Sequence, residues 1–155
     1  GMWYVYKNFY DEKYVFLQDS MYLTDSIDKY KNLDLKPINF CDGWDHATYQ
    51  HKQWVREKLS TTKYKYLDDG FKMIQFNSFL ISRNVLDILN QNGISNILPT
   101  NKIQSEAMER LLGIVFTQEN LTNVVPFYSY SNCLNPHTDI NLIKTEIVKK
   151  WRNRK

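Results

Sequence analysis

The chain has 155 residues, of which 43% are hydrophobic and 24% are charged, with five glycines, four prolines and two cysteines. This composition excludes collagen-like, intrinsically disordered and disulfide-scaffold proteins. No apolar run approaches the roughly 20 residues of a membrane-spanning helix, and the N-terminus lacks the apolar core of a signal peptide. We therefore expect a soluble, cytoplasmic protein with one domain over residues 2–155, and interpret Gly1 as a residue left by tag cleavage.

The formal net charge of +3 is concentrated at the C-terminus. Five of the 20 basic residues lie in the last seven positions, so the rest of the chain has 15 basic and 17 acidic residues. Cations at the end of a helix complement its dipole, and this is our interpretation of the cluster. A basic C-terminal helix that binds nucleic acid remains an alternative. The near-neutral body of the chain argues against it.

The first part of the chain is rich in aromatic residues, with 15 of the 23 before position 67. Residues 3–6 and 14–17 read as two short strands around a polar turn at 11–13, because aromatic and β-branched side chains favour strands. Residues 18–46 lack a clean period and carry several turn signals. They predict an irregular segment with a short strand or helical turn.

Residues 47–59 fit an amphipathic helix that ends near Ser60. A turn at 68–70 then precedes a strand over residues 71–76, which combine β-branched and aromatic side chains. The inner side of the predicted helix is formed by Ala47, His51, Trp54, Val55 and either Lys58 or Leu59.

The segment after this strand carries the clearest local signals. Residues 79–81 predict a strand, and Ser82 predicts the N-cap of a following helix. Gly93 supplies the left-handed residue that closes such a helix, after which Ile94 can fold back onto its last turn. Residues 97–99 then read as a short extended exit. The apolar stripe of this helix consists of Val85, Leu86 and Leu89.

A further helix is predicted over residues 102–112. Gly113 is expected to end this helix before a strand at 114–116. Its inward side chains are expected to be Ile103, Ala107, Leu111 and Leu112.

The last part of the chain predicts an extended segment and a helix. Residues 124–128 are expected to be extended, with Pro126 indicating a sheet edge. A helix is expected from Thr138 to the end of the chain. Together, the predicted elements indicate an α+β fold, in which a small, mostly antiparallel sheet is packed by about four helices. The apolar stripe of this last helix is Ile140, Ile143, Ile147 and Trp151.

The block from Phe79 to Thr100 has a recognisable order. A strand and a Ser-capped helix are followed by Gly93-Ile94-Ser95-Asn96 and a short apolar strand that is closed by Pro99. This block resembles one in the immunity proteins of bacterial polymorphic-toxin systems, and the tyrosine-rich start at residues 2–6 agrees with that family. The resemblance covers about 22 residues and the first few. It implies a protein that binds and neutralises a toxin, with no catalytic residue to carry over.

The residue types best suited to metal binding or catalysis cluster at Cys41–His46 and His51. If they met Cys133 and His137 in space, a tetrahedral zinc site could form. The compact Cys-x-x-Cys and His-x-x-x-His spacings are absent, and His46 and His51 fall on different sides of a helix. A Cys–His nucleophile would also need an oxyanion hole that no motif indicates. A metal-binding or Cys/His-dependent enzyme centred on Cys41, His46 and His51 is therefore the alternative, and we expect no cofactor or metal.

The leading hypothesis is a non-catalytic interaction protein, an immunity-type inhibitor that binds a cognate toxin. Aromatic and charged side chains in the helix predicted over residues 47–59 and in the loop before it are the types from which interface hot spots are made. The acidic ones would suit a basic toxin face. The expected contact surface consists of Asp42, Trp44, Asp45, His46, Tyr49 and Trp54.

Overall fold

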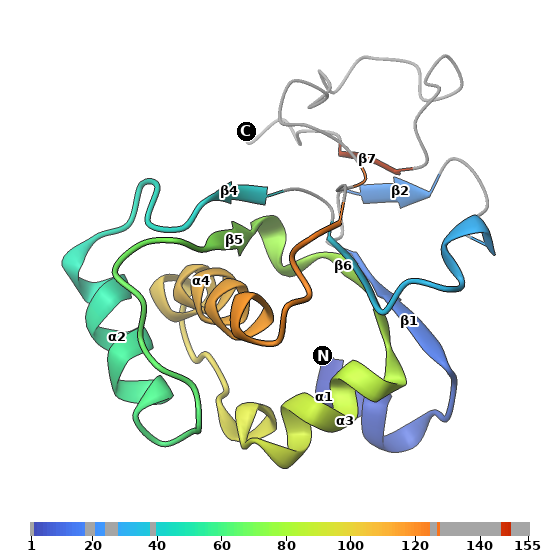
Figure 1. Cartoon of the computed structure of the whole chain (residues 1–155), viewed down its shortest axis with the longest axis horizontal. Helices are drawn as coiled ribbons and strands as arrows, with labels where there is room; N and C mark the ends of the chain where they lie inside the picture. Colours follow the sequence, from blue (N-terminus) through green and yellow to red (C-terminus); the bar gives the residue numbers. More distant parts are fainter. Residues whose placement is uncertain are drawn as a thin grey trace.

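The computed structural model describes residues 2–17, 21–23, 28–37, 40–124, 127 and 147–149. Within these residues the chain has an α+β fold, as predicted, with four α-helices and seven short strands (Figure 1). The helices are α1 (Met2–Asn8), α2 (Tyr49–Leu59), α3 (Arg83–Gln91) and α4 (Lys102–Gln118). The strands are β1 (Lys13–Phe16), β2 (Met21–Leu23), β3 (Leu35–Pro37), β4 (Phe40–Asp42), β5 (Lys72–Ile74), β6 (Phe79–Ser82) and β7 (Ile147–Lys149).

All strand pairs among the described residues are antiparallel. The largest sheet has the order β1–β6–β3, and the other two are the pairs β4–β5 and β2–β7. All four side chains of the central strand β6 are buried. A strand that is paired on both edges and covered by helices is expected to have this pattern.

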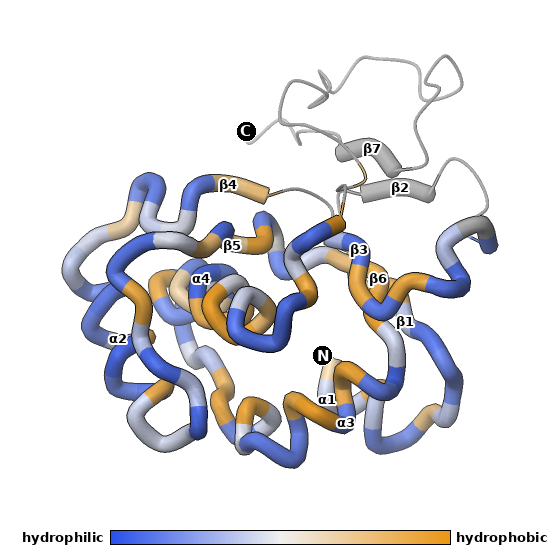
Figure 2. Tube along the Cα trace, in the orientation of Figure 1, coloured by the Kyte–Doolittle hydropathy of each residue, from blue (hydrophilic) through white to orange (hydrophobic). Residues whose placement is uncertain are grey.

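Helix α4 is the core helix of the protein. Figure 1 shows it in the middle of the molecule, with α2 on one side and the β1–β6–β3 sheet on the other. Every residue from Arg110 to Phe116 is buried, which a helix can satisfy only when other elements pack around it. Phe116 meets Phe79 of β6 edge to face, with ring centroids 6.1 Å apart. Figure 2 shows how hydrophobic residues gather along α3 and α4.

The predicted end of this helix at Gly113 is wrong, and so is the strand at 114–116, because α4 runs unbroken to Gln118. Gly113 serves a different purpose. A Cβ at this position would collide with the carbonyl oxygen of Lys72 and would lie 2.9 Å from the Cα of Met73. Glycine therefore lets the backbone of α4 approach β5 directly. Ile103, predicted to point inward, is 40% exposed because the first turn of α4 extends beyond the core.

The first predicted strand is a helix, α1. Its half-buried residues Met2, Val5 and Tyr6 have helical spacing and pack against the core. The Tyr6 hydroxyl donates a 2.6 Å hydrogen bond to Asp87 of α3, and the guanidinium of Arg83 lies 4.6 Å from its ring. These tertiary contacts outweigh the strand propensity of the aromatic side chains.

The segment from residue 79 to 94 forms as the sequence predicts. The Ser82 hydroxyl accepts a hydrogen bond from the Val85 amide, which caps α3. Gly93 has φ = 80°, in the left-handed region, and Ile94 is fully buried. After it, residues 97–99 form no strand.

The predictions elsewhere have mixed outcomes. The helix over 47–59 is confirmed as α2, with His51, Trp54, Val55 and Leu59 buried. Of the strand predicted over residues 71–76, only Lys72–Ile74 form a strand, β5, because the chain turns at Gln75–Asn77. The segment 18–46 is more regular than predicted, since β3 and β4 lie in it.

The predictions for the C-terminal part fall mostly outside the described residues. Its described residues 147–149 form strand β7 rather than the predicted helix, because they pair with β2. The rest of the helix predicted from Thr138, with its basic end, lies outside the described residues, as does most of the segment 124–128. Within the part of the chain that the structure describes, no helix combines the length and the apolar character that crossing a membrane requires.

The C-terminal end of α4 is tied to the segment after α2. The Glu119 carboxylate accepts a hydrogen bond from the Tyr64 hydroxyl and pairs with Lys63, both at 2.7 Å. The Gln118 side chain bonds both the amide and the carbonyl of Lys65. The hydrogen bond from Lys63 holds the pKa of Glu119 below its usual value, and the bond from Tyr64 acts in the same direction.

Gly113→Ala tests the close contact between α4 and β5. The added methyl group meets backbone atoms that cannot rotate away, so we expect a loss of about 3 kcal/mol in the free energy of unfolding. Urea unfolding followed by circular dichroism measures it. Ser105→Ala, at an exposed position of the same helix, should change the free energy by less than about 0.5 kcal/mol. Equal stability of the two variants would contradict the close contact.

Glu119→Gln tests the contacts at the end of α4. A carboxylate with a lowered pKa stabilises the fold above its unfolded pKa, and this contribution disappears as the pH falls through the folded pKa. At pH 7 we expect the variant to be less stable by about 1–2 kcal/mol. The difference from the wild type should shrink as the pH falls from about 4.3, the usual pKa of a glutamate, through the lower pKa of the folded state. Urea unfolding at several pH values measures this, and a difference that is independent of pH would refute it.

Candidate functional site

Two turns at one end of the β4–β5 pair enclose a groove of about 410 Å³. One turn follows β4 and the other precedes β5, and the antiparallel pairing of Asp42 with Lys72 brings them together. Four of the lining residues are aspartates with exposed side chains. We call this feature the aspartate groove, and its lining residues are Asp42, Gly43, Trp44, Asp45, Asp68, Asp69, Gly70 and Phe71.

The turns have the local sequence that such tight geometry needs. Gly70 has φ = 72°, a left-handed conformation that favours glycine. A Cβ on Gly43 would collide with the ring of Phe71, so glycine lets this ring lie against the opposite turn. The amide of Asp45 donates to the carbonyl of Asp42 at 3.0 Å, which closes the first turn. The shape of the groove is therefore encoded in its two glycines.

Trp44 is the fixed aromatic element of the groove. Its indole stacks on Tyr66, with centroids 5.4 Å apart and planes at 28°, and meets Phe71 edge to face at 5.2 Å. The indole nitrogen donates a 3.0 Å hydrogen bond to the carbonyl of Leu67. These contacts leave the Trp44 ring half-buried and hold it in one orientation.

Helix α2 places two cations beside this aromatic pair. Lys52 and Arg56 are four residues apart and so share one face of the helix. The Lys52 ammonium lies 5.5 Å from the Trp44 ring, and the Arg56 guanidinium lies 4.3 Å from the Tyr66 ring. Arg56 also approaches Asp68 to 3.9 Å, beyond hydrogen-bond distance. The aromatic pair thus lies between a basic helix face and the carboxylates of the groove.

A buried arginine supports the groove from behind. Arg110 of α4 is 4% exposed, and its guanidinium donates to the carbonyl of Asp45 at 2.6 Å and to that of Glu106 at 2.8 Å. Burial lowers the pKa of this guanidinium. Arg110 fixes the backbone of the first turn to helix α4, so the turn that carries Asp42 and Asp45 is held in place.

The structure brings half of the predicted contact residues together. Asp42, Trp44 and Asp45 line the aspartate groove. His46 comes next, with a left-handed φ of 52° and a largely exposed ring whose Nε2 lies 3.5 Å from the Asp45 carboxylate.

The other two predicted contact residues, Tyr49 and Trp54, lie in helix α2. Tyr49 is its first residue and is 75% exposed. Trp54 is only 8% exposed and belongs to the hydrophobic core, so the contact surface must be drawn without it.

Sequence reasoning missed the second turn of the groove. It placed a solvated turn at residues 68–70 but gave no reason to put this turn opposite Asp42–Asp45. That proximity comes from the pairing of β4 with β5, whose register no local pattern indicates. The supporting roles of Tyr66 and Arg110 were missed for the same reason, since both depend on contacts between distant segments.

The structure gives His51 a structural role. Its Nδ1 accepts a 2.9 Å hydrogen bond from the Thr48 amide, which caps the start of α2. In the neutral ring Nε2 then carries the proton, and it lies 3.2 Å from a carboxylate oxygen of Glu106. The ring is 5% exposed. Both nitrogens are therefore engaged, and His51 is not placed to act as a general base.

Cys41 is a free, half-buried cysteine of β4. Burial raises the pKa of its thiol, and the carboxylates of Asp45, Glu109 and Asp42 raise it further. A nucleophilic cysteine requires the opposite shift. Among the described residues, no group of three or more His, Cys, Asp or Glu side chains could hold a metal ion. Cys133 and His137, the other members of the hypothetical zinc site, lie outside them.

The chain was compared with protein-family models, with curated proteins and with solved structures, and none of them matches it. A function must therefore be inferred from the residues described above.

The alkylation rate of Cys41 tests the state of its thiol. In a Cys133→Ser background, we expect iodoacetamide to react with Cys41 at pH 8 at least about fivefold more slowly than with N-acetylcysteine, because each unit of raised pKa removes most of the thiolate. The same chain unfolded in urea should react at the rate of the free thiol, which controls for the reagent. Alkylation faster than that of N-acetylcysteine would contradict this account and favour an activated nucleophile.

Proposed function

We propose that this chain is a non-catalytic, cytoplasmic interaction protein that binds a basic surface of a partner protein in the aspartate groove. The observation that carries the proposal is the combination of four exposed aspartates with a fixed aromatic wall in one hollow. The carboxylates attract a positive charge, and the wall offers an apolar surface to the stem that bears it.

The groove is suited to a lysine or arginine side chain of the partner. Carboxylates on two facing turns can accept several hydrogen bonds from an ammonium or a guanidinium group. The rings of Trp44 and Phe71 line the same hollow and can contact the aliphatic stem. Because Arg110 and the Trp44 contacts hold the first turn in place, binding there orders few side chains and loses little conformational entropy.

Among the described residues, the states of Cys41 and His51 support a role in binding rather than catalysis. Burial and nearby carboxylates keep the Cys41 thiol protonated, and His51 has both ring nitrogens engaged. Neither group can serve the alternative enzyme centred on Cys41, His46 and His51.

The class of partner comes from the sequence resemblance. The block from Phe79 to Thr100 resembles immunity proteins of polymorphic-toxin systems, so the proposed partner is a cognate toxin with a basic face. The resemblance implies that the chain binds and neutralises this toxin. An acidic groove suits this task where the toxin surface is positively charged.

Quantitative capture from native lysate tests the groove. The bait is the wild-type chain, a groove variant (Asp68→Asn with Asp69→Asn) or a control (Asp11→Asn with Glu12→Gln), which changes the net charge equally at exposed positions elsewhere. We expect the wild type and the control to retain one basic partner at near-equal molar amounts. The groove variant should retain at least about tenfold less, and capture should weaken as salt rises.

A co-expression assay tests inhibition. The captured partner should arrest bacterial growth when expressed alone, and wild-type chain should restore growth whereas the groove variant should not. Equal capture by the groove variant, or an acidic partner, would refute the groove as the binding site. A partner that is harmless when expressed alone would refute the inhibitor role.

A further inference from the structure

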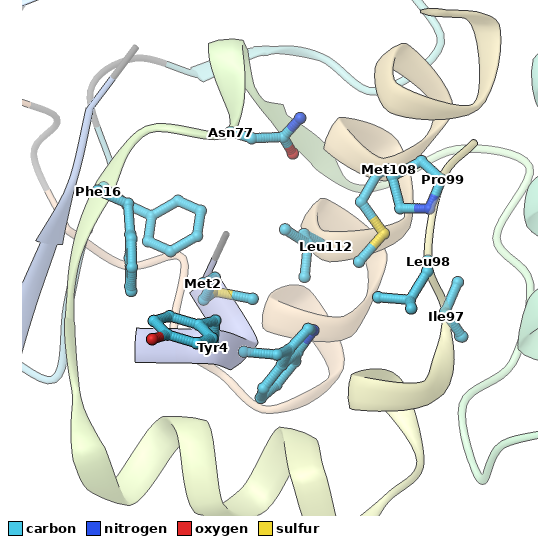
Figure 3. A pocket seen from close by; sticks show the side chains of 11 residues that line it. Met2, Tyr4, Phe16, Asn77, Ile97, Leu98, Pro99, Met108 and Leu112 are labelled. Atoms are coloured by element: carbon cyan, nitrogen blue, oxygen red, sulfur yellow. The ribbon is translucent and has the colours of Figure 1, made fainter. Parts of the chain in front are cut away.

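A second hollow lies on another part of the core, away from the aspartate groove residues. It has a volume of about 480 Å³, within the range of sites for small ligands. Figure 3 shows side chains from α1, from the region of β1 and β6 and from α4 surrounding it. We call it the apolar cavity, and its lining residues are Met2, Trp3, Tyr4, Phe16, Asn77, Phe79, Ile97, Leu98, Pro99, Met108 and Leu112.

The lining sets the chemistry of a ligand. None of these residues is charged, so a carboxylate, phosphate or ammonium would lose its hydration without a partner. Aromatic rings line one part of the cavity, and Met2 and Met108 contribute flexible, polarisable side chains that adapt to a bound ring. Leu98 and Tyr4 are 63% and 64% exposed and mark the opening to solvent.

One polar atom of the lining lacks a partner. The Asn77 side-chain nitrogen donates a 3.2 Å hydrogen bond to the carbonyl of Ser105, whereas its oxygen is buried without any hydrogen bond. The amide cannot be reversed, because the Ser105 carbonyl can only accept. Figure 3 shows Asn77 at the edge of the cavity, with its oxygen on the side of the apolar side chains. Leaving such an acceptor unpaired is unfavourable, so a donor supplied by a ligand would relieve it.

We infer that the apolar cavity binds a neutral, largely apolar small molecule with a ring, whose single N–H or O–H group donates to the Asn77 oxygen. The volume lies in the range of sites for small organic ligands, the uncharged lining disfavours ions, and the unpaired oxygen selects for a donor. Asn77 has a φ of 47°, a conformation that asparagine tolerates better than most residues and that holds the amide at this position. This site is independent of the proposed binding to a partner protein.

Fluorescence titration tests the cavity with a defined probe. N-phenyl-1-naphthylamine is neutral, carries one N–H group and brightens in apolar surroundings. We expect saturable binding of one molecule per chain. 1-Phenoxynaphthalene has nearly the same shape with an ether oxygen in place of the N–H, so it should displace the probe with weaker affinity.

Asn77→Gly isolates the acceptor, because glycine keeps the positive φ while removing the amide. The affinity for N-phenyl-1-naphthylamine should fall about 3- to 10-fold, the effect of one hydrogen bond. The affinity for 1-phenoxynaphthalene should stay within about twofold. An equal fall for both molecules would refute the hydrogen bond to Asn77.

Leu98→Asp tests the location of the site with little risk to the fold, since Leu98 is exposed. A charge at the opening should lower the affinity of the cavity for both molecules at least tenfold. Ile103→Asp is the control, because Ile103 is 40% exposed and does not line the cavity. Unsaturable binding, or unchanged binding to Leu98→Asp with wild-type thermal stability, would overturn the inference.

Discussion

The direct contact of α4 with β5 at Gly113 is the constraint on which the rest of the structure depends. A helix can lie this close to a strand only where it has no side chain, and Gly113 supplies that position within the 17-residue helix α4. The close approach leaves α4 surrounded, so its run from Arg110 to Phe116 is buried on every side. Both ends of the helix are then fixed by polar contacts, from Glu106 to His51 at one end and from Glu119 to Tyr64 at the other.

The geometry of the aspartate groove depends on this contact between α4 and β5. β5 is fixed by α4, and β4 is fixed by β5, so the turns at the ends of these strands have defined positions. Arg110 adds a direct link from the core helix to the first turn, and Trp44 links that turn to the segment after α2. The exposed aspartates are therefore held by a chain of buried contacts rather than by contacts with one another.

The sequence predicted what depends on neighbouring residues. Ser82, Val85, Leu89 and Gly93 lie within one helix and its caps, so their roles could be read directly, and the buried face of α2 could be read from its spacing. The errors occurred where distant contacts decide. Residues 3–6 have strand propensity, yet the partners of Tyr6 on α3 make them helical. A glycine at position 113 is typical of a helix end, yet α4 continues through it because only a residue without a side chain fits against the backbone of β5.

The same distinction applies to the two hollows. The sequence drew attention to Asp42–His46 because polar and aromatic residues cluster there, and four of those five residues do line the groove. It could not show that Asp68 and Asp69 lie opposite. The apolar cavity left no local pattern, because its lining comes from segments spread between residues 2 and 112.

The placement of the four aspartates has a consequence for how such a protein can diversify. Their side chains are exposed and belong to turns, whereas the residues that hold those turns are the buried Arg110, the half-buried Trp44 and the two glycines. Substitutions at 42, 45, 68 and 69 can therefore alter charge and shape in the groove at little cost to folding. Recognition and stability reside in separate sets of residues, and each set can change while the other is kept.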